Sequence, residues 1–226
     1  MAASFGSPLL FARAYNYRMA TVAQIDLLQE GVLFDLPMPL TFCPSIEMSD
    51  EDLIAFSRRN KPYRIERNAK GELEIMSPVG MDGSQWEAEV ILQLGNWTKA
   101  HEGHFFSSNG GFNLPDGSMR SPDAAWISEE RYRAVSRSDR RRFAPGSPQF
   151  LIEILSESDS RSILEAKMEM WLPNGAQLAW MIDPYARTLS IYRPGEEVEV
   201  LDRPDSVEAG DPVAGFRLST LLLWDE

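Results

Sequence analysis

The chain has 226 residues, 43% of them hydrophobic, and its 34 acidic residues outnumber 22 Lys and Arg to give a formal net charge of −12. A chain of this size buries enough apolar surface to fold without disulfides or structural metals. The acidic charge excludes a general nucleic-acid coat protein. Phosphate binding depends on Lys and Arg, so a nucleic-acid partner would need a local basic patch or bound cations.

Residues 1–45 show no sustained hydrophobic period and contain three prolines between positions 37 and 44. We interpret them as an N-terminal arm. The domain is then expected to span residues 46–226. Its first element is a short helix after Ser49, because Ser49 and Asp52 have the spacing of a helix capping box.

A β-hairpin is expected next, since residues 63–67 and 72–76 alternate apolar and polar side chains around the turn at 68–71. Residues 84–100 then place apolar side chains on one stripe at helical spacing, with Gly103 just past the end. The pattern therefore predicts the first long helix there. Its stripe consists of Trp86, Val90, Leu94 and Trp97.

The second half of the chain alternates strands with one more long helix, which is predicted over residues 160–172. Residues 150–155 form a nearly continuous apolar run, as in a buried central strand. The dipeptides Asp183-Pro184 and Pro194-Gly195 indicate turns between the last strands. The remaining strands are expected at 105–108, 124–127, 178–182, 188–192 and 198–201.

The chain is poor in side chains that form disulfides or bind zinc. Cys43 is the single cysteine and cannot form an internal disulfide, which is typical of the reducing cytoplasm. His101 and His104 are the only histidines, which excludes a zinc site with three histidine ligands. No apolar run approaches the roughly 20 residues that span a bilayer, so no membrane partner is expected. Carboxylates must therefore carry most of the candidate chemistry.

Three charged residues lie where hydrophobic periodicity favours apolar ones. Glu153 lies in the middle of the strand at 150–155, where a lone carboxylate is costly unless it is paired or metal-bound. Lys167 lies inside the apolar stripe of the second long helix, and Asp123 follows a proline at the start of a strand. Each has an ordinary alternative: a strand-end glutamate in solvent, a lysine that lifts its ammonium to water, and a turn aspartate.

Together, the three side chains favour a metal-dependent phosphodiester hydrolase. Asp123 and Glu153 would supply hard oxygen ligands for Mg²⁺ or Mn²⁺, which polarises the phosphate and activates water. Lys167 would place a cation beside the attacking water or the pentavalent transition state. We therefore interpret Asp123, Glu153 and Lys167 as one catalytic site, with the two carboxylates as metal ligands.

Several motifs accompany these residues in order: Met76-Ser77-Pro78, Ser121-Pro122-Asp123, Glu153-Ile154-Leu155-Ser156 with Ser158-Asp159, Lys167 and Trp180-Met181-Ile182-Asp183-Pro184. With these spacings the chain resembles, over roughly residues 46–226, the Uma-type restriction endonucleases, formerly a domain of unknown function, within the PD-(D/E)XK superfamily. The resemblance implies an α/β fold with a restriction-endonuclease-like core: a central mixed β-sheet flanked by helices, an extra β-hairpin and C-terminal strands. It also implies Mg²⁺-dependent endonuclease activity on DNA. A homodimer is expected by analogy with folds of this type that cut two strands.

Two positions depart from the superfamily pattern. That pattern places its lysine two residues after the glutamate, where this chain has Leu155. Lys167 on the following helix is the substitute, in a migration that the family shares. The family often has tyrosine where this chain has Trp171, which removes a hydroxyl from the region of the site.

The superfamily also has an acidic residue on the first long helix, where Glu87 and Glu89 compete. We prefer Glu89 as a further metal ligand and catalytic residue, because it aligns with the family's glutamate. It also shares a polar sector of the helix with Gln93 and Asn96. A solvated surface glutamate is an equally weighted alternative.

Residues 131–142 form a basic run in which six arginines stand against the single Asp139. Such a run would contact phosphates, and a solvated basic helix that balances the acidic remainder is the alternative. The arginines are Arg131, Arg133, Arg137, Arg140, Arg141 and Arg142.

Two other functions stay open from the sequence. A nuclease-fold protein that binds DNA or assembles with partners without cleavage agrees with the acidic charge and with the missing lysine after Glu153. A glycosidase with a carboxylate pair ranks last, because Lys167 has no role in that mechanism.

Overall fold

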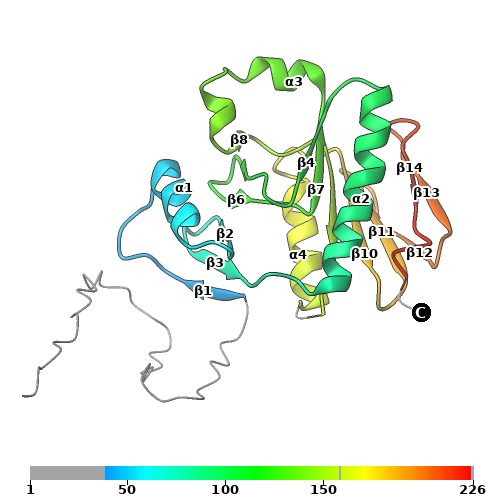
Figure 1. The fold of residues 1–226 in the computed structure, drawn as a ribbon, viewed down its shortest axis with the longest axis horizontal. Coiled ribbons are helices and arrows are strands. Elements are labelled where there is room, and N and C mark those ends of the chain that lie inside the picture. Colours follow the sequence, from blue (N-terminus) through cyan, green and yellow to red (C-terminus); the bar gives the residue numbers. More distant parts are fainter. Residues whose placement is uncertain (1–38, 158, 225–226) are drawn as a thin grey trace, which may run out of the picture.

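The computed structural model describes residues 39–157 and 159–224, which form two six-stranded sheets, a two-stranded sheet and four α-helices (Figure 1). The elements are, in chain order, β1 (Leu40–Phe42), α1 (Asp50–Arg59), β2 (Arg64–Arg67), β3 (Leu73–Met76), α2 (Met81–Ala100), β4 (His104–Ser107), β5 (Phe112–Asn113), β6 (Met119–Arg120), β7 (Ala124–Ile127), α3 (Glu129–Ala134), the 3₁₀ helix η1 (Asp139–Arg141), β8 (Ala144–Pro145), β9 (Phe150–Ile154), α4 (Arg161–Trp171), β10 (Leu178–Asp183), β11 (Thr188–Tyr192), β12 (Glu199–Asp202), β13 (Ser206–Glu208) and β14 (Arg217–Ser219).

The first sheet, in the order β1-β3-β2-β6-β5-β8, is built around the predicted hairpin. β2 and β3 pair antiparallel with Ile65 opposite Ile75. Helix α1 begins after Ser49, whose hydroxyl accepts a hydrogen bond from the backbone N–H of Asp52 while the Asp52 carboxylate accepts one from the backbone N–H of Ser49. The predicted hairpin and capping box are confirmed.

The second sheet, in the order β12-β11-β10-β9-β7-β4, is the central one. β9 runs parallel to β10 and antiparallel to β7, and all five residues of β9 are buried. Alternate side chains of these strands point to opposite faces, where α2 covers one face and α4 the other (Figure 1). Helix α2 contributes Trp86, Val90 and Leu94, and α4 contributes Leu164, Met168 and Trp171.

The predicted α/β class, with a mixed sheet between helices, is confirmed. So are the two long helices, at Met81–Ala100 and Arg161–Trp171, and the strand at Phe150–Ile154. Residues 1–38, most of the predicted arm, lie outside the described residues. Strand β1 lies within that predicted arm and pairs with β3, and the division of the chain into arm and domain stays a prediction.

Several short elements were not predicted. β5, β6 and β8 have two residues each, which is too short for an alternating pattern to be recognised. The basic run lies on α3, η1 and the loop between them, so it is not one continuous helix. No helix within the described ranges combines the length and the apolar character needed to cross a membrane.

Candidate active site

The pairing of β7 with β9 brings Asp123 and Glu153 side by side. Ala124 pairs antiparallel with Ile152. Asp123, one residue before Ala124, and Glu153, one residue after Ile152, are therefore the next pair along the two strands. The backbone N–H of Ile154 donates to Asp123 Oδ2 at 2.8 Å, which fixes this carboxylate at the end of β9. Both residues are buried and line a cavity of about 80 Å³. Two carboxylates that are distant in sequence thus share one small volume.

Lys167 joins the two carboxylates from helix α4. Its Nζ lies 2.9 Å from Glu153 Oε1, and its side chain is only 14% exposed, so the ammonium does not extend into solvent. One turn further along α4, the Trp171 indole N–H donates to Glu153 Oε1 at 3.1 Å. Trp171, at the position where the resemblance implied a tyrosine, therefore offers a donor to the site.

The environment shifts the proton affinity of Glu153 and Lys167. Burial, together with the nearby carboxylates of Asp123 and Glu66, raises the pKa of Glu153 to about 7, although the Lys167 ammonium acts to lower it. Burial acts to lower the pKa of Lys167, but the carboxylates of Glu153 and Glu66 outweigh it and raise that pKa. Lys167 therefore stays cationic, while Glu153 can hold or release a proton near neutral pH.

Glu66 on β2 is a member of this cluster that the sequence did not single out. It is 1% exposed. It accepts hydrogen bonds from the backbone N–H of Ser121 and from Arg120 Nη1, both at 3.0 Å, and its Oε1 lies 3.4 Å from Lys167 Nζ. Burial acts to raise the pKa of Glu66, but Lys167, Arg64 and Arg120 lower it to about 2. The hairpin pattern gave no signal, because the pairing of β6 with β2 and the cations that meet Glu66 are tertiary contacts.

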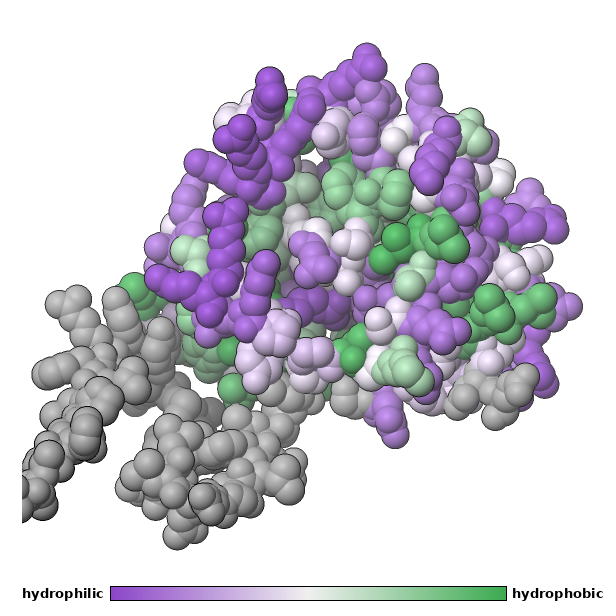
Figure 2. All heavy atoms as spheres, in the orientation of Figure 1, coloured by the Kyte–Doolittle hydropathy of each residue, from purple (hydrophilic) through white to green (hydrophobic). Residues whose placement is uncertain are grey.

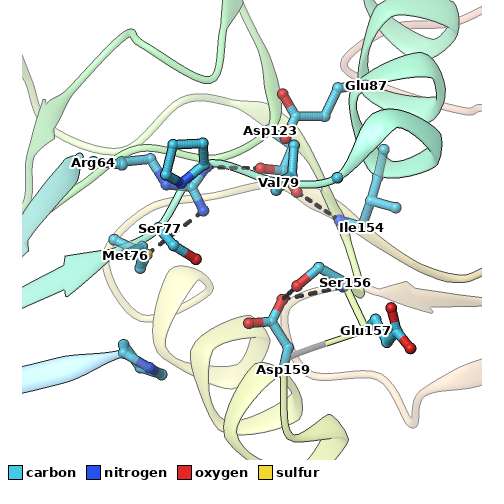
Figure 3. Close-up of a pocket in the computed structure, with 13 residues that line it drawn as sticks. Arg64, Met76, Ser77, Val79, Glu87, Asp123, Ile154, Ser156, Glu157 and Asp159 are labelled. Atoms are coloured by element: carbon cyan, nitrogen blue, oxygen red, sulfur yellow. Dashed lines mark hydrogen bonds and ion pairs between the residues drawn. The ribbon is translucent and has the colours of Figure 1, made fainter. Parts of the chain in front are cut away.

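A larger pocket of about 370 Å³ opens in front of Asp123 (Figure 3). Arg64 lies in its wall and donates from Nη1 to Asp123 Oδ1 at 2.8 Å. Residues of the motifs that carried the family resemblance, at positions 76–78, 123, 154, 156 and 159, meet around this pocket. Its acidic lining residues are Glu87, Asp123, Glu157 and Asp159. The pocket is therefore strongly acidic, with Arg64 as its cationic lining residue.

The structure brings Glu87, and not the preferred Glu89, to this pocket. Glu89 accepts a hydrogen bond from Gln93 at 2.9 Å, and Gln93 in turn exchanges two hydrogen bonds with the backbone of Ser219. Glu87 accepts from the Ser108 hydroxyl at 3.0 Å, and burial and the Asp123 carboxylate raise its pKa. Residues two apart on a helix point about 200° apart, so only one of the two glutamates can face Asp123. The place that we expected Glu89 to take is occupied by Glu87.

The donor set determines which metal would fit. Among the described residues, no three His, Cys, Asp or Glu side chains are grouped so that they could hold a metal ion. Zinc-type cages are therefore not formed by this part of the chain. Mg²⁺, however, usually binds one or two carboxylates and completes its shell with water and substrate phosphates. The adjacent carboxylates of Asp123 and Glu153 are of the number and kind that such a site uses.

Comparisons with known proteins bear on the family and the fold of this chain. The model of the Uma2 family, described as "Putative restriction endonuclease", matches residues 50–221. A crystal structure from Anabaena variabilis, described as "a putative nuclease belonging to DUF820", has a TM-score of 0.64 and 21% sequence identity, and the match covers 78% of this chain and 97% of that chain. No curated protein matches the chain. The family match includes all the residues of the cluster, and the structural likeness supports the fold.

Proposed function

The chain belongs to the Uma2 family, and from this premise we propose that it is a Mg²⁺- or Mn²⁺-dependent endonuclease that hydrolyses phosphodiester bonds of DNA. The observation that supports this best is the convergence of Asp123, Glu153 and Lys167 from β7, β9 and α4, with Lys167 Nζ 2.9 Å from the Glu153 carboxylate. A buried ammonium beside two carboxylates is costly to maintain for structure alone. It is well suited to the stabilisation of charge that develops during phosphodiester cleavage.

Asp123 and Glu153 would hold the metal ion. When bound, the ion would polarise the scissile phosphate and lower the pKa of a bound water. Lys167 would keep its proton throughout and present positive charge to the attacking water or the transition state. Arg64 lies in the wall of the pocket with its side chain 28% exposed and, while it holds Asp123, would also contact a substrate phosphate.

Glu66 would act as a positioning residue. It does not line the larger pocket, and it is hydrogen-bonded to groups of the protein on both sides. Its carboxylate lies 3.4 Å from Lys167 Nζ and keeps its charge because its pKa is about 2. Removal of Glu66 would release Lys167 toward Glu153 and alter the shape of the site.

A cleavage assay tests the proposal directly. Purified protein is incubated with Mg²⁺ or Mn²⁺ and with linear, supercoiled, single-stranded and duplex DNA. Asp123→Asn and Glu153→Gln are expected to lower the cleavage rate by at least about a hundredfold, because each removes a charged ligand of the ion. Glu89→Gln, on the other side of α2, is the matched control and should cleave like the wild type. Unchanged cleavage by Asp123→Asn would remove the assignment.

A nuclease-fold protein that binds DNA without cutting it is the second candidate. The observation that favours it is that Arg64 and Lys167 already pair with Asp123 and Glu153. Calorimetric titration with Mn²⁺ separates the two functions. Absence of Mn²⁺ binding at millimolar concentration, with DNA binding intact, would support the non-cleaving protein.

A homodimer is expected for a double-strand cut and is checked by light scattering with and without duplex DNA.

A further inference from the structure

A second pocket, of about 410 Å³, lies between α1, the α3 and η1 segment and β5, and Ile127 at the far end of β7 from Asp123 forms part of its wall. Four of the described residues that line it are arginines and none is Asp or Glu. The arginines are Arg58, Arg140, Arg141 and Arg142. We call this the basic pocket. It contains three of the six arginines of the basic run at residues 131–142 and shares no lining residue with the pocket at Asp123.

Two of these arginines are available to bind an anion. Arg142 pairs with Glu51 at 2.6 Å, and Arg140 lies over the ring of Tyr132, 4.2 Å from its centroid. Arg58 and Arg141, by contrast, are exposed and form no ion pair with any residue in the described part of the chain. Figure 2 shows strongly hydrophilic side chains gathered at the upper left of the molecule, over α1 and α3. In a chain with a net charge of −12, this pocket is a local site of positive potential.

The basic pocket also has an apolar floor. Phe106 and Phe143 are half-buried there, and Phe106 packs edge to face on Phe112 with ring centroids 5.6 Å apart. Tyr132 serves a different purpose, because His104 stacks on its ring with centroids 3.5 Å apart while Arg140 also lies over it. Tyr132 therefore holds Arg140 in place, and the two phenylalanines offer the apolar surface. Arginines around an aromatic floor are the combination that proteins use to bind single-stranded nucleic acid.

We propose that the basic pocket binds an unpaired nucleotide of the nucleic-acid substrate. Its phosphates would lie on Arg58 and Arg141, and its base would lie against Phe106 and Phe143. Asp123 and Ile127, at the two ends of β7, are four residues apart, which is about 13 Å at roughly 3.3 Å per residue. One nucleic-acid strand could therefore occupy both pockets. The inference rests on the proposed function only in taking nucleic acid as the substrate.

Binding is tested without cleavage, in the full chain carrying Asp123→Asn, with EDTA present. Fluorescence anisotropy measures the affinity for a labelled single-stranded oligonucleotide and for the matched duplex at several salt concentrations. Adding Arg58→Gln with Arg141→Gln should weaken single-strand binding at least tenfold and reduce the slope of log affinity against log salt by about 1.4, since each lost phosphate contact contributes about 0.7. The matched control is Arg203→Gln with Arg217→Gln, which makes the same change of net charge near β13 and β14 and should alter affinity less than twofold.

Phe106→Leu tests the base-binding part, because it keeps an apolar side chain and removes the ring. It should weaken single-strand binding about fivefold or more and leave duplex binding nearly unchanged, while the thermal melt confirms folding. Equal binding by the two double variants would overturn the proposal. So would a silent Phe106→Leu, or displacement of the oligonucleotide by polyglutamate at equal concentration. Since no arm requires cleavage, failure of the proposed nuclease activity would be seen separately, as the absence of DNA cleavage by the wild type with Mg²⁺ or Mn²⁺.

Discussion

The two pockets at the ends of β7 differ in charge, and only the pocket at Asp123 lies beside a cluster of buried charged side chains. The pocket at Asp123 is lined by four carboxylates and Arg64, whereas the basic pocket is lined by four arginines without a carboxylate among the described residues. A phosphodiester is repelled by the first unless a cation neutralises it and is attracted by the second without help. Net charge alone, at −12, describes neither of them.

The difference in burial determines how each region responds to mutation. Glu66, Glu153 and Lys167 form a buried cluster, where removal of one charge leaves its partner uncompensated. Arg58 and Arg141 are exposed, so their loss should change binding with little effect on folding. Stability measurements therefore probe the buried cluster of Glu66, Glu153 and Lys167, and affinity measurements probe the basic pocket.

Glu66→Gln should cause the largest loss of stability. It leaves Lys167 and Arg120 without their shared buried carboxylate and should lower the free energy of unfolding by about 3 kcal/mol at neutral pH. The pKa of about 2 gives the same size: a carboxyl depressed from 4.5 contributes about 3 kcal/mol above pH 4.5, which is lost as pH falls toward 2. Urea unfolding measures it.

The control for Glu66→Gln is Glu208→Gln, which breaks an exposed pair with Arg217. That change should alter the free energy of unfolding by less than about 0.5 kcal/mol. Equal losses in the two variants would show that the buried cluster does not respond as a unit, and the contrast between the two regions would not hold.

The pH dependence of Glu153 has the opposite sign and is the next largest effect. Its pKa is about 7 in the folded protein against an ordinary value of 4.5 for a glutamate in the unfolded chain, so the folded state holds the proton more tightly. This contribution is fully present below pH 4.5 and is lost as pH rises through 7, by roughly 2 to 3 kcal/mol between pH 5 and 8. Urea unfolding without metal at both pH values should show the decrease in the wild type, and Glu153→Gln should remove it. A decrease of the same size in that variant would assign the effect to another group.

The sequence predicted the strongly patterned elements and three residues that the structure brings together in the candidate active site. Asp123, Glu153 and Lys167 were recognisable because a charge on an apolar strand or helix stripe contradicts its neighbours. Their roles in metal binding and catalysis stay predictions. The structure adds that Lys167 contacts Glu153, which distinguishes it from a lysine whose ammonium lies in water.

Glu66, Glu87 and the basic pocket depend on tertiary contacts that the sequence does not reveal. Glu66 is a polar position of the predicted hairpin, and its burial is compensated by Arg120 and Lys167, which come from other elements. The choice between Glu87 and Glu89 depends on how α2 is rotated against β14. The basic pocket requires Arg58 from α1 and Arg141 from η1, which are 83 residues apart in the sequence.

Lys167→Met should destabilise the metal-free protein by about 2 kcal/mol at pH 8. The substitution keeps the apolar stem and removes the charge between Glu66 and Glu153. The loss is smaller than that for Glu66→Gln because Glu153, with its pKa of about 7, can take up a proton, and the deficit should shrink at pH 6. Added Mg²⁺ should restore much of the stability by binding the folded state.

Thermal melts of Lys167→Met with and without Mg²⁺ provide this measurement. Lys99→Met, at the exposed end of α2, is the matched control and should melt like the wild type. Identical melts for the two variants would mean that Lys167 contributes nothing through its charge, and the proposed site would then work without a lysine.

Ser49→Ala should give the smallest loss of stability, and its effect on binding should be confined to the basic pocket. Ser49 caps α1, the helix that carries Arg58, and loss of the cap should cost about 1 kcal/mol. Ser160 occupies the same position on α4, the helix that carries Lys167, but its side chain makes no capping hydrogen bond, so Ser160→Ala is a matched control with an expected change near zero. Urea unfolding compares the two variants.

Because α1 contributes no lining residue to the pocket at Asp123, Mn²⁺ affinity should be unchanged in Ser49→Ala. The affinity for single-stranded nucleic acid should fall, but by less than in the double arginine variant. A loss of Mn²⁺ affinity in Ser49→Ala would show that the two pockets are mechanically coupled through the first sheet and are not independent sites.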